Sequence, residues 1–231
     1  MAAAPLLALL SLAAAEAPLP PFAGEYLLLR NGREVGEARI AYGPTADGWR
    51  IESALDAGLL GGMLSFRSRE HSRLAWREGL PASERFHARR EQPLRSREQE
   101  ILVDPAAGTV TVRDSRRGES RHPLPGPALD PLAALLRAAL AAKREERRFA
   151  YLEVNRGAPR ERAGRIAGSL RLRVGERELE CIRVERLSED PDRLSASCHA
   201  PALGYAPVLI EHADDGERLE LRLRALPAPA P

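Results

Sequence analysis

Residues 64–76 read LSFRSREHSRLAW, and the alternation of side chains along this stretch decides the fold. The odd positions are mostly charged and face solvent: Arg67, Arg69, His71, Arg73, Ala75. The even positions point inward: Leu64, Phe66, Ser68, Glu70, Ser72, Leu74, Trp76. A period of two residues is that of a β-strand with one solvated face and one buried face.

Other short runs have the same period. Trp49, Ile51 and Leu55 alternate with charged residues, and apolar residues do so again over 170–174 and 219–223. Turn-forming residues separate the runs at 31–32, 44–48, 78–79, 104–108, 190–192 and 214–216. We therefore expect a mostly β, antiparallel fold, with a curved sheet that is sandwiched or curled into an open barrel.

Two local features modify this pattern. The apolar parity changes between Val35 and Ala38, which predicts a β-bulge at Gly36. Asp130 and Pro131 suit the N-cap and first turn of a helix, and apolar residues follow at helical spacing: Leu132, Leu135, Leu136, Ala139, Leu140. This spacing predicts one helix over about 130–147 that lays its leucine stripe on the sheet.

The chain divides into four predicted parts. Residues 1–15 carry no charged side chain, hold the apolar run LLALL at 6–10 and end in AAA, which is typical of a signal peptide. We expect cleavage after Ala15 and export to the periplasm. Residues 16–21 form a proline-rich lead-in, residues 22–226 a single β-rich domain, and residues 227–231 a disordered tail.

Composition and motifs argue against several classes of function. The net charge is only +2 and aromatic residues make up 4%, which disfavours a nucleic-acid partner. The mature chain has no apolar stretch of membrane-spanning length. Nucleophile-elbow, phosphate-loop and zinc-protease motifs are absent, and the five histidines are scattered singly. We expect a protein that is not an enzyme and uses neither a metal nor a cofactor.

Glu70 is the most unusual residue on the inward face. It stands between Ser68 and Ser72, and a carboxylate there must be paired, hydrogen-bonded or solvated in a cavity. Arg90, on the following run, is a partner if the hairpin register places the two opposite. Two hypotheses follow: a structural salt bridge, or a polar ligand-binding anchor formed by Glu70, Ser68, Ser72 and Arg90.

The two cysteines, Cys181 and Cys198, fall in successive predicted strands around the turn at 189–192. An exported protein meets oxidants, so a cross-strand disulfide is one interpretation. The alternative is two small buried thiols, and the strand register decides between them.

Several short motifs lie at 22–26 (FAGEY), 32–38 (GREVGEA), 69–72 with 79–81, 129–132 (LDPL) and 204–208 (GYAPV). Together they resemble the exported bacterial family named domain of unknown function 3108. Members of that family tend to carry an aromatic residue before the Ala-Pro that is Ala200-Pro201 here, whereas this chain has Cys198-His199. The resemblance implies a β-rich protein of the Gram-negative envelope with no established activity or catalytic residues.

These observations lead to two functional hypotheses. The first is a non-enzymatic periplasmic protein that binds a lipid or another apolar or amphipathic envelope component. The alternative is a structural or assembly protein that docks through its Arg-rich strand faces onto an envelope protein partner.

Overall fold

The computed structural model describes residues 17–59 and 64–225, so the expected signal peptide at 1–15 and tail at 227–231 lie outside the described residues. The strands before the helix are β1 (Phe22–Arg30), β2 (Arg33–Thr45), β3 (Gly48–Leu59), β4 (Leu64–Arg77), β5 (Leu80–Gln92), β6 (Arg95–Asp104), β7 (Thr109–Asp114), β8 (Gly118–Pro123) and β9 (Ala128–Leu129). The elements from the helix onward are α1 (Ala134–Lys143), β10 (Arg148–Glu153), β11 (Arg160–Val174), β12 (Arg177–Arg186), β13 (Leu194–Ala200), the 3₁₀ turn η1 (Pro201–Leu203), β14 (Ala206–Asp214) and β15 (Glu217–Ala225).

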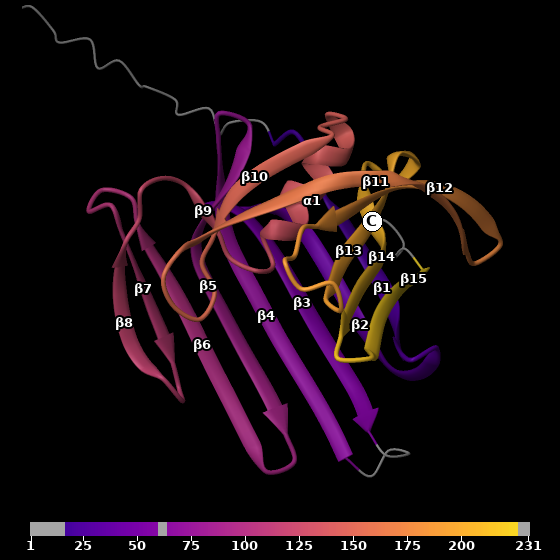
Figure 1. Cartoon of the computed structure of the whole chain (residues 1–231), viewed down its shortest axis with the longest axis horizontal. Coiled ribbons are helices and arrows are strands. Elements are labelled where there is room, and N and C mark those ends of the chain that lie inside the picture. The colour runs from indigo at the N-terminus through magenta and orange to yellow at the C-terminus, as the bar shows by residue number, and fades with distance from the viewer. Residues whose placement is uncertain (1–16, 60–63, 226–231) are drawn as a thin grey trace, which may run out of the picture.

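All fifteen described strands belong to one sheet, in the order β8 to β1 followed by β15 to β9. Consecutive strands are neighbours in the sheet, except that β8 and β9 form its two edges. β1 pairs with β15 and so joins the two halves. Among the described strands, only β9 and β10 pair in parallel. The sheet is open and strongly curved, and β10 and β11 cross in front of the long strands of the first half (Figure 1). The expected mostly β, antiparallel fold is confirmed, and its sheet does not close into a barrel.

The stretch that predicted the fold is β4, and its even face does point inward. Ser72 and Leu74 are fully buried there, and Ser68 and Trp76 are buried nearly as well. The Trp76 indole donates a 2.8 Å hydrogen bond to the hydroxyl of Tyr42, which satisfies a polar group inside the core.

The predicted bulge lies one residue before Gly36. Leu28 pairs with Gly36 while Leu29 pairs with Glu34, so Val35 is the extra residue. A Cβ on Gly36 would lie 2.2 Å from the carbonyl oxygen of Asp56 on β3. Glycine is therefore required where the bulged strand approaches its neighbour.

The predicted helix is shorter than expected at both ends. Residues 131–133 form a turn, and α1 begins at Ala134. Glu145 has a φ of 55°, and the amides of Glu145 and Glu146 bond to the carbonyls of Ala142 and Ala141. This is a Schellman motif, which ends the helix at Lys143 rather than at 147. Within the described residues, no helix has the length and apolar character needed to span a membrane.

One hydrophobic core joins both halves of the sheet. It contains Ile51, Leu74 and Phe86 from the first half and Cys181 and Val208 from the second, with α1 packed between the halves through buried apolar residues: Leu136, Ala139, Leu140. The described part of the lead-in packs here too, since Leu19 is only 2% exposed. The concave face of the first half is therefore covered by the helix and the second half.

Cys181 on β12 and Cys198 on β13 form a disulfide, with their Cα atoms 5.5 Å apart. Arg183, not Cys181, is directly opposite Cys198. The two cysteines are diagonal neighbours, and because the offset is two residues they still share a face. The disulfide interpretation is thus confirmed over the two-thiol alternative.

Candidate functional site

A cavity of about 290 Å³ lies between α1, the concave face of β2 and β3, and strands of the second half. Its walls are mainly apolar, with contributions from Ile40, Leu132, Leu135, Val184, Ile210 and Leu221. Ser53, Ser195, Ser197 and Asn155 supply a few uncharged polar groups. An apolar pocket with a small number of placed polar groups is the usual form of a small-molecule site, and this volume is near the lower end of the typical range of about 300–1,000 Å³.

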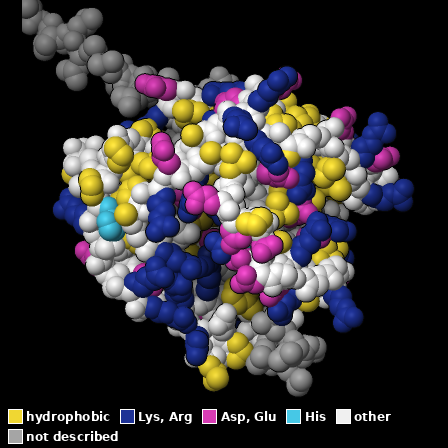
Figure 2. All heavy atoms as spheres, in the orientation of Figure 1, with side chains coloured by type: hydrophobic (Ala, Val, Ile, Leu, Met, Phe, Trp, Pro, Cys, Tyr) yellow, Lys and Arg dark blue, Asp and Glu magenta, His cyan; other side chains and the backbone are white. Residues whose placement is uncertain are grey.

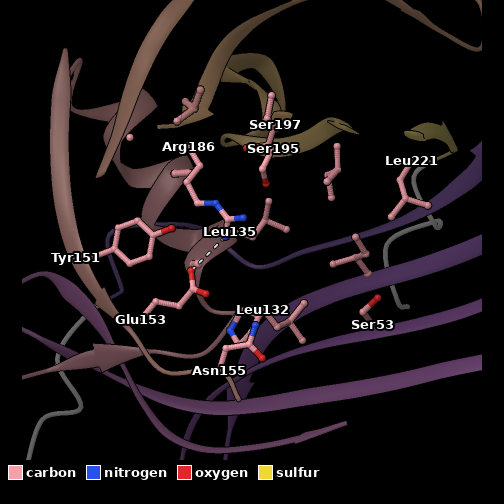
Figure 3. Close-up of a pocket in the computed structure, with 18 of the residues that line it drawn as sticks. Ser53, Leu132, Leu135, Tyr151, Glu153, Asn155, Arg186, Ser195, Ser197 and Leu221 are labelled. Atoms are coloured by element: carbon pink, nitrogen blue, oxygen red, sulfur yellow. Dashed lines mark hydrogen bonds and ion pairs between the residues drawn. The ribbon is translucent and has the colours of Figure 1, made fainter. Parts of the chain in front are cut away.

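One ion pair stands in the cavity wall. Glu153 ends β10 and Arg186 ends β12, and Arg186 Nη1 donates a 3.3 Å hydrogen bond to Glu153 Oε2 (Figure 3). Glu153 has a side chain only 3% exposed, and Arg162 Nε lies 3.8 Å from the same oxygen. Two guanidinium groups thus lie against one buried carboxylate and compensate its charge inside the protein.

Tyr151 lies beside this pair on the same face of β10, because residues two apart on a strand share a face. Burial, and then the Glu153 carboxylate, raise the pKa of Tyr151 to about 12, against the opposing effect of the Arg186 and Arg162 charges. The phenol is therefore neutral at physiological pH and offers the cavity a hydroxyl group rather than a charge.

Ser197 and His199 form a second polar contact at the cavity. Ser197 Oγ is 2.8 Å from His199 Nε2, and His199 Nδ1 is 3.1 Å from the carbonyl oxygen of Tyr205. A carbonyl only accepts, so Nδ1–H donates to it and Nε2 accepts from the serine hydroxyl. Burial lowers the pKa of His199 to about 4. Such a group is a poor general base at neutral pH, and we interpret the contact as structural.

The structure pairs Glu70 with Arg90, as the salt-bridge hypothesis requires. Arg90 Nη2 and Nε donate to Glu70 Oε1 at 2.7 and 3.1 Å, and Ser68 Oγ donates to the same oxygen at 3.1 Å. The hairpin register places Arg90 opposite Ser68, one step diagonal to Glu70. Glu70 does not line the cavity itself, but Ser53, directly opposite it on β3, does. Ligand binding by this group stays a prediction.

Ser72 does not join the Glu70 group. Its hydroxyl donates to Asp130 Oδ2 at 2.5 Å, and Ser83 Oγ donates to the same oxygen at 2.6 Å. Asp130 Oδ1 accepts from the amides of Leu132 and Ala133 at 2.9 and 3.0 Å. Burial raises the pKa of this fully buried carboxyl, while its four donors oppose the rise. Asp130 therefore anchors the start of the α1 segment to β4 and β5 and so positions the cavity wall.

The predicted N-cap role of Asp130 is confirmed, because its Oδ1 accepts from the amides of Leu132 and Ala133. Sequence reasoning did not find the cavity ion pair or the contacts of Asp130 with Ser72 and Ser83. Glu153 and Arg186 are 33 residues apart and meet only because β11 lies between their strands. One signal was present: Phe149, Tyr151 and Glu153 alternate as one strand face, so a carboxylate shares a face with two aromatic rings. Across residues 17–59 and 64–225, no three His, Cys, Asp or Glu side chains are placed to hold a metal ion.

Comparison with known proteins gives a family without a described activity. A search of the curated proteins finds no match to this chain. The family model described as "Protein of unknown function (DUF3108)" matches residues 25–221, which span β1 to β15 and every residue that lines the cavity. The chain belongs to the DUF3108 family.

Proposed function

We propose that this protein is a non-enzymatic, exported protein of the bacterial envelope that binds an apolar or amphipathic envelope component in the cavity beneath α1. The mainly apolar lining of that cavity is the observation that carries the proposal. A preformed apolar pocket favours ligands that gain by leaving water. Its one carboxylate is already neutralised by Arg186 and Arg162, which favours binding over acid–base chemistry.

Two observations support export. Residues 1–15 have the composition of a signal peptide, and the disulfide between Cys181 and Cys198 is of a kind that persists in oxidising compartments. Fractionation of cells that express the full chain tests this part. We expect the protein in the periplasmic fraction with Glu16 as its first residue, and recovery of the unprocessed chain in the cytoplasm would contradict it.

Binding can be tested with the neutral fluorescent probe N-phenyl-1-naphthylamine. Ala138 lies on the cavity side of α1, so Ala138→Phe fills the cavity. We expect this variant to bind the probe about tenfold more weakly than the wild type, because overfilling leaves no room for a ligand. Ala106, in the exposed turn before β7, provides the matched control Ala106→Phe, which should bind as the wild type does. Equal binding by both variants would contradict the proposal.

The docking hypothesis has less support. Several arginines of the Arg-rich outer faces pair with carboxylates of the same chain, such as Arg69 with Asp56 at 2.7 Å and Arg85 with Glu100 at 2.5 Å. Charges already paired within the chain contribute less to the attraction of a partner.

A further inference from the structure

Two arginines lie opposite each other on neighbouring strands, in a partly exposed region of the concave face of the sheet. Arg90 on β5 is directly opposite Arg97 on β6, and both side chains lie on the inner face with Glu70 and Gln99. Like charges at directly opposite positions destabilise a sheet unless something neutralises them. Among residues 17–59 and 64–225, each arginine pairs with one carboxylate, Arg90 with Glu70 and Arg97 with Asp114.

Arg90 and Arg97 each bind their carboxylate through the same edge of the guanidinium group, the one formed by Nε and Nη2. Arg90 uses Nε and Nη2 to bind Glu70, and Arg97 uses Nε and Nη2 to bind Asp114 at 3.0 and 2.5 Å. Neither Nη1 group makes a hydrogen bond to another described residue. Each guanidinium therefore keeps donors available after its ion pair has formed.

Two further arginines approach this pair without a carboxylate of their own. Arg156 follows β10 in a loop that is held to β6 by a 2.5 Å hydrogen bond from Gln99 Nε2 to the carbonyl oxygen of Asn155. Arg117, from the turn between β7 and β8, reaches the carbonyl oxygen of Arg156 at 3.5 Å. Neither makes an ion pair within the part of the chain that the structure describes. Partial desolvation, and then the positive charges of Arg97, Arg90 and Arg117, lower the pKa of Arg156.

The concave arginine cluster (Arg90, Arg97, Arg117, Arg156) thus carries four positive charges against the two of Glu70 and Asp114. It lies next to the cavity, since Asn155 lines the cavity and Ser53, another lining residue, is opposite Glu70. Figure 2 shows Lys and Arg side chains gathered over β5 and β6 beside a hollow in the molecular surface. One elongated ligand can therefore contact both features.

We propose that the concave arginine cluster binds the anionic head group, a phosphate or carboxylate, of an amphiphile whose apolar chain occupies the cavity. This inference rests on the proposed function and names its ligand class. The planar guanidinium groups match the oxygen atoms of such head groups. The same chemistry would recognise free phosphate, so the experiment must separate the head group from the free anion.

Isothermal titration calorimetry of the full mature chain with three probes makes this separation. The probes are decyl phosphate, decyltrimethylammonium with the same chain and opposite charge, and inorganic phosphate, all below micelle-forming concentrations. We expect decyl phosphate to bind about tenfold more tightly than either of the others, because only it satisfies both the cavity and the cluster.

Arg117 and Arg156 are the residues to replace, because their loss strands no carboxylate. The double variant Arg117→Gln/Arg156→Gln should bind decyl phosphate about tenfold more weakly and leave decyltrimethylammonium unaffected. Arg50 and Arg171 are exposed and likewise unpaired within the described chain, so Arg50→Gln/Arg171→Gln removes the same charge elsewhere. This control should bind decyl phosphate as the wild type does.

Three results would overturn the inference. Equal affinity for the two amphiphiles, unchanged in the double variant, would remove the cluster as a head-group site and leave the cavity function intact. Inorganic phosphate that binds as tightly as decyl phosphate would make the cluster a free-anion site. Absence of binding by both amphiphiles would reject the proposed function itself.

Discussion

Replacement of Asp130 should loosen α1 from the sheet. Its carboxylate is fully buried and accepts four hydrogen bonds, two from the hydroxyls of Ser72 and Ser83 and two from the amides of Leu132 and Ala133. Asp130→Ala leaves all four donors without this acceptor. The hydroxyls can rotate toward other acceptors, but the amides are fixed by the backbone.

The magnitude follows from the amides. A buried donor without an acceptor costs about 1–3 kcal/mol, so two of them predict a loss of about 4 kcal/mol in the free energy of unfolding. Asp130→Asn is the matched variant. Its side-chain oxygen still accepts from the amides of Leu132 and Ala133, and the serine hydroxyls can turn to accept from its NH₂ group. We expect a loss of about 1 kcal/mol for this change.

Urea unfolding followed by tryptophan fluorescence measures both variants, because Trp76 lies in the core. A lower midpoint with an unchanged slope identifies a loss of stability rather than a change in the unfolded state. A cost below about 1 kcal/mol for Asp130→Ala, or equal costs for the two variants, would refute the role of Asp130 as the acceptor for the α1 segment.

Three further predictions concern the Glu70–Arg90 ion pair, the disulfide and the buried His199. Glu70→Ala and Arg90→Ala should each cost about 1 kcal/mol, since both side chains are partly exposed at 17% and 32%, and strictly additive costs in the double mutant would reject the pairing. Periplasmic protein should show no free thiol on titration under denaturing conditions, and Cys181→Ser/Cys198→Ser should lower stability by about 3 kcal/mol; two free thiols would exclude the disulfide. His199 takes up its proton near pH 4 when folded and near pH 6.5 when unfolded, so stability should fall by about 3 kcal/mol as the pH drops from 6.5 to 4. The variant His199→Gln should flatten this dependence, and an unchanged pH profile would contradict the burial of a neutral imidazole.

The sequence predicted those features that depend on local patterns. Alternation along β4 identifies its buried face because the side-chain period of a strand is a local property, and Gly36 marks the bulge to within one residue. The predicted C-terminal end of α1 was wrong because the helix stops where Glu145 adopts a positive φ. Glycine is the residue that usually occupies this conformation at a helix end. A glutamate at this position does not indicate that the helix ends there.

The site was harder to predict because its contacts are non-local. Glu70 and Arg90 belong to one hairpin, and hairpin register suffices to suggest their pair. Glu153 meets Arg186 only when β10, β11 and β12 pair within the second half, and Asp130 meets Ser72 only when the α1 segment packs on the first half. Tertiary packing of this kind leaves no period in the sequence, so the cavity became visible only in the structure.

Native mass spectrometry of the protein purified from the periplasm without detergent tests the central claim most directly. The account predicts a population whose mass exceeds that of the mature chain by one bound amphiphile, and predicts that Ala138→Phe loses this population while Ala106→Phe keeps it. A single species at the mass of the bare chain, which also takes up no decyl phosphate when this is added, would contradict the claim that the cavity is a binding site.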